Sequence, residues 1–319
     1  MVFFVHAFLN NGYYNTPIEG FIMYAATFIR QFCMICVPLF LMITGYLQGG
    51  REVEFNKKHI LKILKVLIPY IIITIISYWI LYLFGILEGR TLATMLFGFV
   101  NNGYTWYIEM YIGLFMLIPF INGAWNSLKT KEKKEGLVLL MIFLCFVPNL
   151  INAFYPVFPD HWIILYPFAY YLIGTYIKEY GLNMQPHNKL FVIGIASTLH
   201  FLMAIFFFKE NMWSAYNGYH NPFVMINAIM VFDLLLDIKT ENLKTKTKKK
   251  LMKIADAVLP AYMISFIVDT FVYRLFAYNF IPTVQMRILL AIPLIFVAAT
   301  LSIELGMIIT KISNSIMKK

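Results

Sequence analysis

The sequence predicts an all-α protein, a polytopic membrane helix bundle of about ten transmembrane helices. Of its 319 residues, 61% are hydrophobic and 18% aromatic. Only 13% are charged, which is about half the share found in soluble domains. Apolar stretches that could span a hydrocarbon core of about 30 Å recur along the whole chain. Because so few charges cannot cover a water-soluble surface, we expect most of the chain to lie in a lipid bilayer.

Nine apolar stretches are long enough to cross a bilayer, which takes about 20 residues. They cover approximately residues 21–47, 66–87, 106–121, 137–154, 161–177, 190–208, 221–236, 257–278 and 287–309. A tenth stretch, residues 1–9, is only half a span and lacks the charged start and cleavage site of a signal peptide. We therefore expect it to be the outer half of a first helix whose N-terminal part is truncated.

Positive charge is distributed unevenly between alternate loops. Lysine and arginine are enriched on the cytoplasmic side of membrane proteins. With ten helices and both termini in the cytoplasm, 21 of the 26 basic residues fall on that side, in residues 51–65, 129–134, 178–189, 239–253 and 311–319. We therefore expect a multi-pass protein of the plasma membrane. All these loops are too short for a soluble domain, so residues 1–319 should form a single membrane-embedded domain.

Two other classes of ligand are not expected. The formal charge of +10 could suggest nucleic acid, but the basic residues lie between apolar runs instead of on one solvated face. Three cysteines do not make a disulfide framework. Cys33 and Cys36 have the spacing of a metal-binding pair, but nothing nearby supplies two further ligands. We therefore expect neither a nucleic-acid partner nor a metal.

Ionisable residues inside apolar spans are the first functional candidates, because burying them in lipid is costly. These residues are His6, Arg30, Glu109, His200, Asp233, Asp269 and Glu304. One face of the ninth helix should also carry polar groups at helical spacing and look into the bundle: Tyr262, Ser265, Asp269 and Tyr273. Enzymes, transporters, channels and receptors can all contain such residues, so these positions alone do not decide the function.

Short motifs occur in a definite order. The second span ends in VPLFLMITGYL, a basic stretch and Pro69-Tyr70 follow, and the fourth span opens with Trp106-Tyr107 and closes with Pro119-Phe120. This succession resembles the acyltransferase 3 family of membrane O-acyltransferases, whose members carry a VPLFxxSGYL-like helix end, an RxxRxxxP loop and a WYL helix start. The resemblance covers nearly the whole chain. It implies transfer of an acyl group, often acetyl from acetyl-CoA, to hydroxyls of cell-surface or secreted glycans.

The resemblance implies a catalytic role for His6, which matches the histidine of the family's first-helix pattern (here FFVHAF). A neutral imidazole suits a general base for an acceptor hydroxyl, because its ordinary pKa lies near the working pH. The alternative is a histidine that is only hydrogen-bonded at the outer end of a helix. Family members usually have an arginine a few turns earlier, at a position that would precede Met1.

Lys62 and Lys65 match the two arginines of RxxRxxxP by their offset from Pro69. Lysine keeps the charge that could hold the phosphates of CoA but lacks the bidentate fork of arginine. Alternatively, these lysines serve membrane topology only. Acyl-CoA, with acetyl-CoA as the first choice, is the expected co-substrate, and no tightly bound cofactor is expected.

Arg30 stands where relatives that modify surface polysaccharides often carry an arginine before VPLF. It could offset negative charge at the reacting carbonyl, or form a structural ion pair with Glu109 or Asp269. Glu109 could instead orient His6. Trp106 and Tyr107 are typical of an interfacial aromatic anchor or a substrate platform.

Ser265 stands where many family members have a histidine in a YLIH-like pattern, here Tyr262-Met-Ile-Ser265. Serine can form hydrogen bonds but is not a base near neutral pH. Ser265 and Asp269 are expected to contact the acceptor.

The expected function is a membrane O-acyltransferase that takes an acyl group from acyl-CoA at the cytoplasmic face and delivers it to a glycan or lipid-linked acceptor near the outer face. The alternative is a glycan or lipid-linked precursor transporter or flippase without transferase activity. Transporters normally show broken helices or paired repeats, and neither is recognisable in the sequence.

Overall fold

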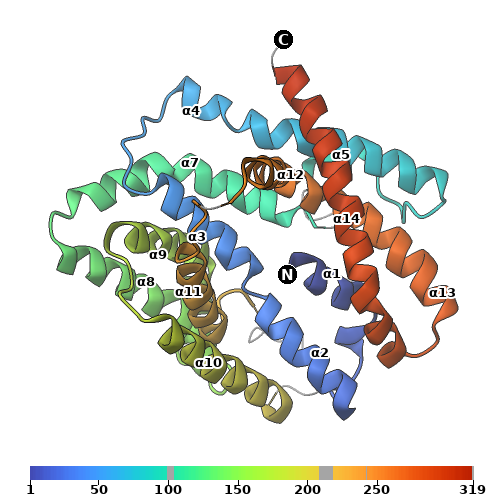
Figure 1. The fold of residues 1–319 in the computed structure, drawn as a ribbon, viewed down its shortest axis with the longest axis horizontal. Coiled ribbons are helices and arrows are strands. Elements are labelled where there is room, and N and C mark those ends of the chain that lie inside the picture. Colours follow the sequence, from blue (N-terminus) through green and yellow to red (C-terminus); the bar gives the residue numbers. More distant parts are fainter. Residues whose placement is uncertain (99–103, 208–217, 242, 318–319) are drawn as a thin grey trace. The chain divides into compact units, whose positions relative to one another are not determined.

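The computed structural model describes residues 1–98, 104–207, 218–241 and 243–317, which form helices joined by turns, without a strand among them (Figure 1). The chain divides into two compact units, each assembled from several stretches of sequence. Unit 1 comprises Met1–Val53, Ile118–Lys239 and Thr283–Leu289, and unit 2 comprises Glu54–Leu117, Thr240–Pro282 and Leu290–Lys319.

The helices of the two units are as follows. Unit 1 contains α1 (Val2–Asn10), η1 (Tyr13–Asn15), α2 (Gly20–Cys33), α3 (Cys36–Gln48), α8 (Lys131–Asn152), η3 (Asp160–Leu165), α9 (Tyr166–Tyr180), α10 (Pro186–Phe207) and α11 (Pro222–Leu236). Unit 2 contains α4 (Lys57–Leu61), α5 (Leu64–Leu83), α6 (Leu92–Phe97), α12 (Thr245–Asp269), the π-helix η5 (Thr270–Ala277) and α13 (Tyr278–Phe280). Both units share α7 (Trp106–Ser127) and α14 (Val284–Met317).

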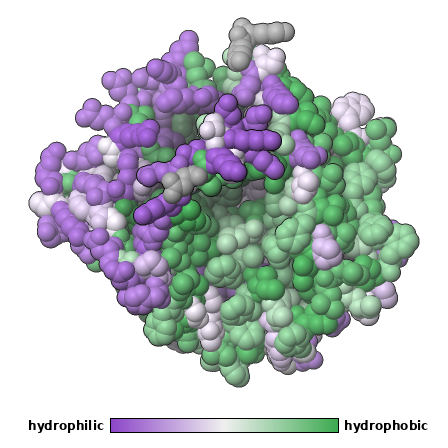
Figure 2. All heavy atoms as spheres, viewed as in Figure 1, coloured by the Kyte–Doolittle hydropathy of each residue, from purple (hydrophilic) through white to green (hydrophobic). Residues whose placement is uncertain are grey.

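Within the described residues, seven helical stretches are long and apolar enough to cross a membrane: Gly20–Gln48, Lys57–Leu83, Trp106–Ser127, Lys131–Asn152, Pro186–Phe207, Thr245–Ala277 and Val284–Met317. They coincide with seven of the nine predicted full spans, which confirms a polytopic helix bundle. Figure 2 shows hydrophobic side chains covering the region of α13 and α14, as expected for helices that face lipid.

The predicted count of about ten spans is not established. The expected spans at 161–177 and 221–236 coincide with α9 and α11, but each of these helices has 15 residues, fewer than the roughly 20 that a straight crossing needs. The first helix, α1, has 9 residues. The structure therefore supports a multi-pass membrane protein with at least three elements too short to cross alone.

The second span is interrupted between α2 and α3, which the sequence analysis did not expect. Pro38 explains the interruption, because it has no N–H for the carbonyl of Met34 and its ring clashes with that carbonyl. Met34 and Ile35 nevertheless keep right-handed helical dihedrals. Their N–H groups donate to the carbonyls of Gln31 and Phe32. The backbone is therefore kinked and still hydrogen-bonded, unlike the unwound segments that coordinate ions in transporters.

Glycines bring α3 and α9 into close contact. Gly45 of α3 lies against the backbone of Tyr171, and Gly174 of α9 lies against the backbone of Met42, so that a Cβ at either glycine would overlap a carbonyl oxygen. The hydroxyl of Thr175 also donates to the carbonyl of Gly45, at 3.3 Å. Small residues that let backbones approach are typical of membrane helix pairs. Gly45 in the VPLFLMITGYL segment is therefore required by packing.

Polar side chains hold the C-terminal end of α3. The amide of Asn122 donates to the carbonyls of Gln48 and Arg51, each at 2.9 Å. The ammonium group of Lys178 donates to the carbonyl of Gly49 at 2.8 Å. The last carbonyls of a helix lack intrahelical partners. These side chains therefore supply the missing donors.

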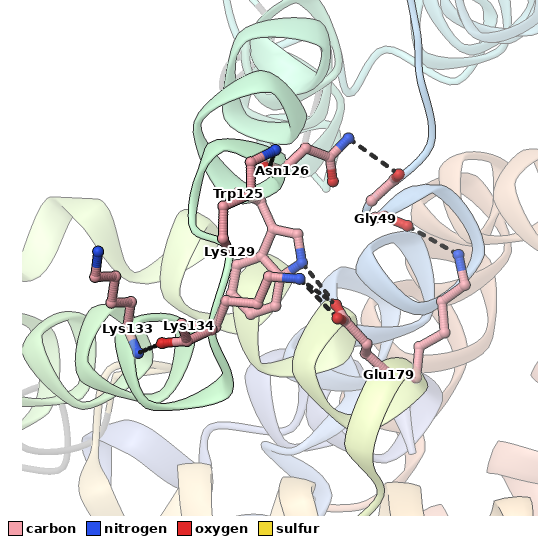
Figure 3. A network of polar contacts seen from close by, with 10 residues as sticks. Gly49, Trp125, Asn126, Lys129, Lys133, Lys134 and Glu179 are labelled. Atoms are coloured by element: carbon pink, nitrogen blue, oxygen red, sulfur yellow. Dashed lines mark hydrogen bonds and ion pairs between the residues drawn. The ribbon is translucent and has the colours of Figure 1, made fainter.

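Glu179 joins α7, α8 and α9 in the same network (Figure 3). Its carboxylate accepts hydrogen bonds from Lys134 Nζ at 2.6 Å and from Trp125 Nε1 at 3.0 Å. Partial burial raises the pKa of Glu179. The hydrogen bonds from Lys134 and Trp125 lower it by more than burial raises it, so that the pKa lies below the ordinary glutamate value. The carboxylate is therefore charged at neutral pH.

A buried lysine connects α10 to α11. Lys189 is 2% exposed, and its ammonium group lies 2.5 Å from Asp233 Oδ2 and 2.6 Å from Asp237 Oδ2. Asp233, one of the ionisable residues that the sequence analysis considered for function, is thus part of a structural ion pair.

Candidate active site

His6 lies on α1 and is 7% exposed. The side-chain amide of Asn10 donates to the carbonyl of His6 at 2.9 Å, which satisfies a carbonyl near the end of a short helix. Helix α1 packs against α2 within unit 1, so His6 and Arg30 lie on two neighbouring helices.

Arg30 lies on α2 and is 4% exposed. Its Nε donates to the hydroxyl of Tyr14 at 3.0 Å, and its guanidinium carbon lies 5.2 Å from the centroid of the Tyr14 ring. The phenol of Tyr14 thus contacts the predicted catalytic arginine through both its hydroxyl and its ring.

In unit 2, α12 and the start of α7 meet at Tyr262. The hydroxyl of Tyr262 donates to the carbonyl of Tyr104, and its ring lies 6.1 Å from that of Tyr107. One turn later, the hydroxyl of Ser265 donates to the carbonyl of Tyr262 at 2.7 Å. The structure therefore brings the segments of two predicted substrate-binding residues, Tyr107 and Ser265, together.

Asp269 ends α12 and is 1% exposed. Tyr273, which is predicted on the same face, lies one turn later in the π-helix η5, which begins at Thr270, and it is buried as well. All residues of α12 from Met263 to Asp269 are buried, so burial alone does not single out the predicted polar face.

Three aromatic rings follow one another along α7. The rings of Tyr107, Tyr111 and Phe115 lie at intervals of four residues, with centroids 6.0 and 6.1 Å apart. The ring of Phe115 stacks on the imidazole of His59 in α4, at 4.4 Å and 5°. Side chains four residues apart lie above one another on a helix. This aromatic row therefore connects the start of α7 with α4.

His59 contacts a carbonyl of α7 that Pro119 leaves without an intrahelical donor. Pro119 has no N–H for the carbonyl of Phe115, and His59 Nε2 lies 3.0 Å from that carbonyl. A carbonyl only accepts, so Nε2 carries the proton. Nδ1 is buried and has no hydrogen-bond partner among the described residues. The sequence analysis missed this contact, although a proline inside an apolar span was a signal that one carbonyl would need another donor.

The lysines that match the family's arginines lie at the α4–α5 connection. Lys62 directly follows α4, Lys65 lies in the first turn of α5, and both side chains are exposed. Lys57 and Lys58 in α4 are exposed as well. This segment therefore carries four exposed ammonium groups. Among the described residues, no group of three His, Cys, Asp or Glu side chains could hold a metal ion.

The comparison with protein families decides the class of protein. The family described as an acyltransferase domain, acyltransferase 3, matches residues 1–307. The chain belongs to the acyltransferase 3 family. No curated protein and no solved structure matches it. This membership confirms the resemblance found in the sequence and establishes a membrane acyltransferase.

In this acyltransferase, the segments that carried the resemblance are largely structural. Pro38 kinks the second span, and Gly45 permits the contact between α3 and α9. Tyr70, which follows Pro69, donates to the carbonyls of Met95 and Leu96 at the end of α6, at 2.7 and 3.1 Å. The short motifs therefore indicate the fold more directly than they indicate the residues that catalyse acyl transfer.

The predicted site residues are divided between the two units of the acyltransferase. His6 and Arg30 belong to unit 1, and the others belong to unit 2: Lys62, Lys65, Trp106, Tyr107, Glu109, Ser265 and Asp269. Trp106 is partly buried against Tyr107, with ring centroids 6.2 Å apart, and Glu109 is exposed on α7. The predicted site residues of unit 1 are thus both buried, whereas those of unit 2 include exposed charges and aromatic rings beside the buried Ser265 and Asp269.

Proposed function

We propose that this acyltransferase moves an acetyl group from acetyl-CoA to a hydroxyl of a cell-surface or secreted glycan. The observation that carries the proposal is the pair of buried ionisable residues, His6 on α1 and Arg30 on the following helix α2, in a chain of the acyltransferase 3 family. Buried ionisable groups inside membrane helices are costly, and they are therefore expected where chemistry needs them.

In the proposed reaction, His6 acts as the general base. The acceptor hydroxyl oxygen forms a bond to the thioester carbonyl carbon while its proton passes to the imidazole. Arg30 stabilises the negative charge that develops on the carbonyl oxygen. The carbon–sulfur bond then breaks, and the CoA thiolate takes the proton from the imidazolium. The products are an acyl ester and free CoA thiol, and His6 returns to its neutral form.

Unit 2 supplies the proposed binding residues. Lys62 and Lys65 would hold the phosphates of CoA, since exposed ammonium groups bind phosphate as point charges. An acceptor would be contacted by aromatic and polar side chains at the start of α7 and in α12: Trp106, Tyr107, Ser265 and Asp269. Glu109 remains a predicted catalytic residue, because its exposed carboxylate is accessible to a substrate.

We further propose that the protein lies in the plasma membrane with both termini in the cytoplasm, because this orientation places 21 of the 26 basic residues on the cytoplasmic side. Cysteines introduced at Lys246 and at Tyr155 test it. In intact cells, an impermeant thiol reagent should label the cysteine at Tyr155 and not the one at Lys246. The reverse pattern would show that the orientation is wrong.

A transfer assay tests the proposed reaction. Membranes that contain the protein, incubated with acetyl-radiolabelled acetyl-CoA, should transfer label to glycan in a form that mild alkali releases, because esters hydrolyse in base far faster than amides. The His6→Gln variant is the matched control and should not transfer. Alkali-stable label would indicate N-acylation. The absence of transfer by folded protein, with glycan movement across the membrane instead, would favour the transporter.

A further inference from the structure

The turn between α1 and α2 is held by its own hydrogen bonds. Asn11 closes the end of α1 by donating from its side-chain amide to the carbonyl of Ala7 at 2.7 Å. Gly12 then takes a φ of 79°, in the left-handed region that favours glycine. The carbonyl of Gly12 accepts from the Asn15 N–H at 3.2 Å and from the Thr16 hydroxyl at 3.0 Å. The turn therefore has a defined conformation.

Tyr13 fastens this turn to α2. Its hydroxyl lies 2.6 Å from the hydroxyl of Thr27, and Thr27 itself donates to the carbonyl of Met23 at 2.7 Å. The proton of Thr27 is thus already used, so the hydrogen bond between the two hydroxyls must be donated by Tyr13. Tyr13 is fully buried and also packs edge-on against Tyr14, with ring centroids 5.2 Å apart. The neighbouring Tyr14 is therefore restricted in position.

Tyr14 in turn holds Arg30, which lies one turn after Thr27 on α2. The Tyr14 hydroxyl accepts from Nε, while the ring of Tyr14 lies beneath the guanidinium group. A guanidinium is planar, so a fixed Nε contact and a fixed ring face together restrict its orientation. Its two terminal nitrogens form the edge that binds oxyanions in a bidentate manner.

We propose that Tyr14 is a positioning residue that sets the orientation of the Arg30 guanidinium toward the reacting carbonyl. The inference rests on the proposed function, in which Arg30 stabilises the oxyanion. Residues 6–30 then position both proposed catalytic groups, because the same short segment carries the base His6, the turn with a defined conformation and the oriented guanidinium of Arg30. A preorganised donor is effective in the transition state because it does not have to reorganise while charge develops.

The test is a double-mutant cycle of Tyr14→Phe and Arg30→Gln, assayed with acetyl-CoA and the membrane glycan. Phenylalanine keeps the ring and removes only the hydroxyl. Tyr14→Phe should lower kcat about 10-fold, the loss expected when one hydrogen bond to a charged group disappears, with KM for acetyl-CoA unchanged. In the Arg30→Gln background, Tyr14→Phe should have no further effect on kcat, because the group that it orients is gone.

Tyr24→Phe is the matched control, since this tyrosine lies on the same helix α2 with an exposed side chain. It should leave kcat unchanged. A wild-type kcat for Tyr14→Phe, or the same loss in both backgrounds, would overturn the positioning role. If Arg30→Gln is impaired while Tyr14→Phe is not, only the inference about Tyr14 fails. A wild-type kcat for Arg30→Gln would overturn both the inference and the proposed role of Arg30.

Discussion

Units 1 and 2 hold their candidate residues by different means. In unit 1, Arg30 is buried and oriented by Tyr14, and the carbonyl of His6 is fixed by Asn10. In unit 2, Lys62 and Lys65 are exposed on flexible side chains. A buried hydrogen-bonded network fixes geometry, whereas exposed ammonium groups attract a phosphate without fixing its position. We therefore expect the loss of His6 or Arg30 to lower the rate of transfer, and the loss of Lys62 and Lys65 to weaken donor binding.

Outside the proposed catalytic residues, the largest expected effect is on the stability of unit 1. Gly174→Leu places a side chain where the backbone of Met42 lies, and such overpacking typically costs about 1–3 kcal/mol. The variant should have a lower thermal midpoint in detergent and a lower level in the membrane. Gly194→Leu in α10 is the control, because no atom lies within 4 Å of an added Cβ there. Equal midpoints for the two variants would contradict the close contact between α3 and α9.

The next largest effect concerns donor binding by unit 2. Replacing both Lys62 and Lys65 by glutamine should raise KM for acetyl-CoA several-fold and change kcat less. The substitutions remove charge that would bind the CoA phosphates but leave the reacting groups in place. Arginine at both positions should be tolerated. Lys133→Gln removes a similarly exposed charge from α8 and should leave KM unchanged. A wild-type KM for the double glutamine variant, at normal membrane levels, would mean that these lysines serve topology only.

The smallest effect is the pH dependence of the network around Glu179. Because the folded protein lowers the pKa of this carboxyl, its contribution to stability is present at neutral pH and is lost as the pH falls through the folded pKa. The side chain is partly exposed, so the effect should be modest. The thermal midpoint of Glu179→Gln should lie below that of the wild type at pH 7, and the two should converge in acid. A constant difference at all pH values would rule out this linkage.

The features that could be predicted from the sequence depend on local pattern. Seven predicted spans coincide with long apolar helices, because hydropathy acts over consecutive residues. The span expected at 161–177 became a shorter α-helix because the chain enters it through the 3-10 helix η3 and leaves it at Gly181, with a φ of 65°. Hydropathy does not distinguish these turns from a continuous helix.

The contacts that shape the candidate site could not be predicted in the same way. Tyr14 reaches Arg30 across a turn, and His59 reaches Phe115 from a distant segment. Each contact joins residues whose spacing carries no periodic signal. The family motif contains Gly45, but it does not say why a glycine is needed. The need comes from the backbone of Tyr171, which lies against Gly45 because α9 packs on α3.

The central claim is that unit 1 supplies the chemistry through His6, and the His6→Gln variant tests it most directly. Glutamine has a similar size and can form hydrogen bonds but is not a base. The label transferred from acetyl-CoA to glycan should fall by about 10² to 10⁴, the usual contribution of general-base catalysis. Binding of acetyl-CoA and the thermal midpoint should stay near those of the wild type. Near-normal transfer by this variant would contradict the account, because His6 would then be a structural histidine and not the base.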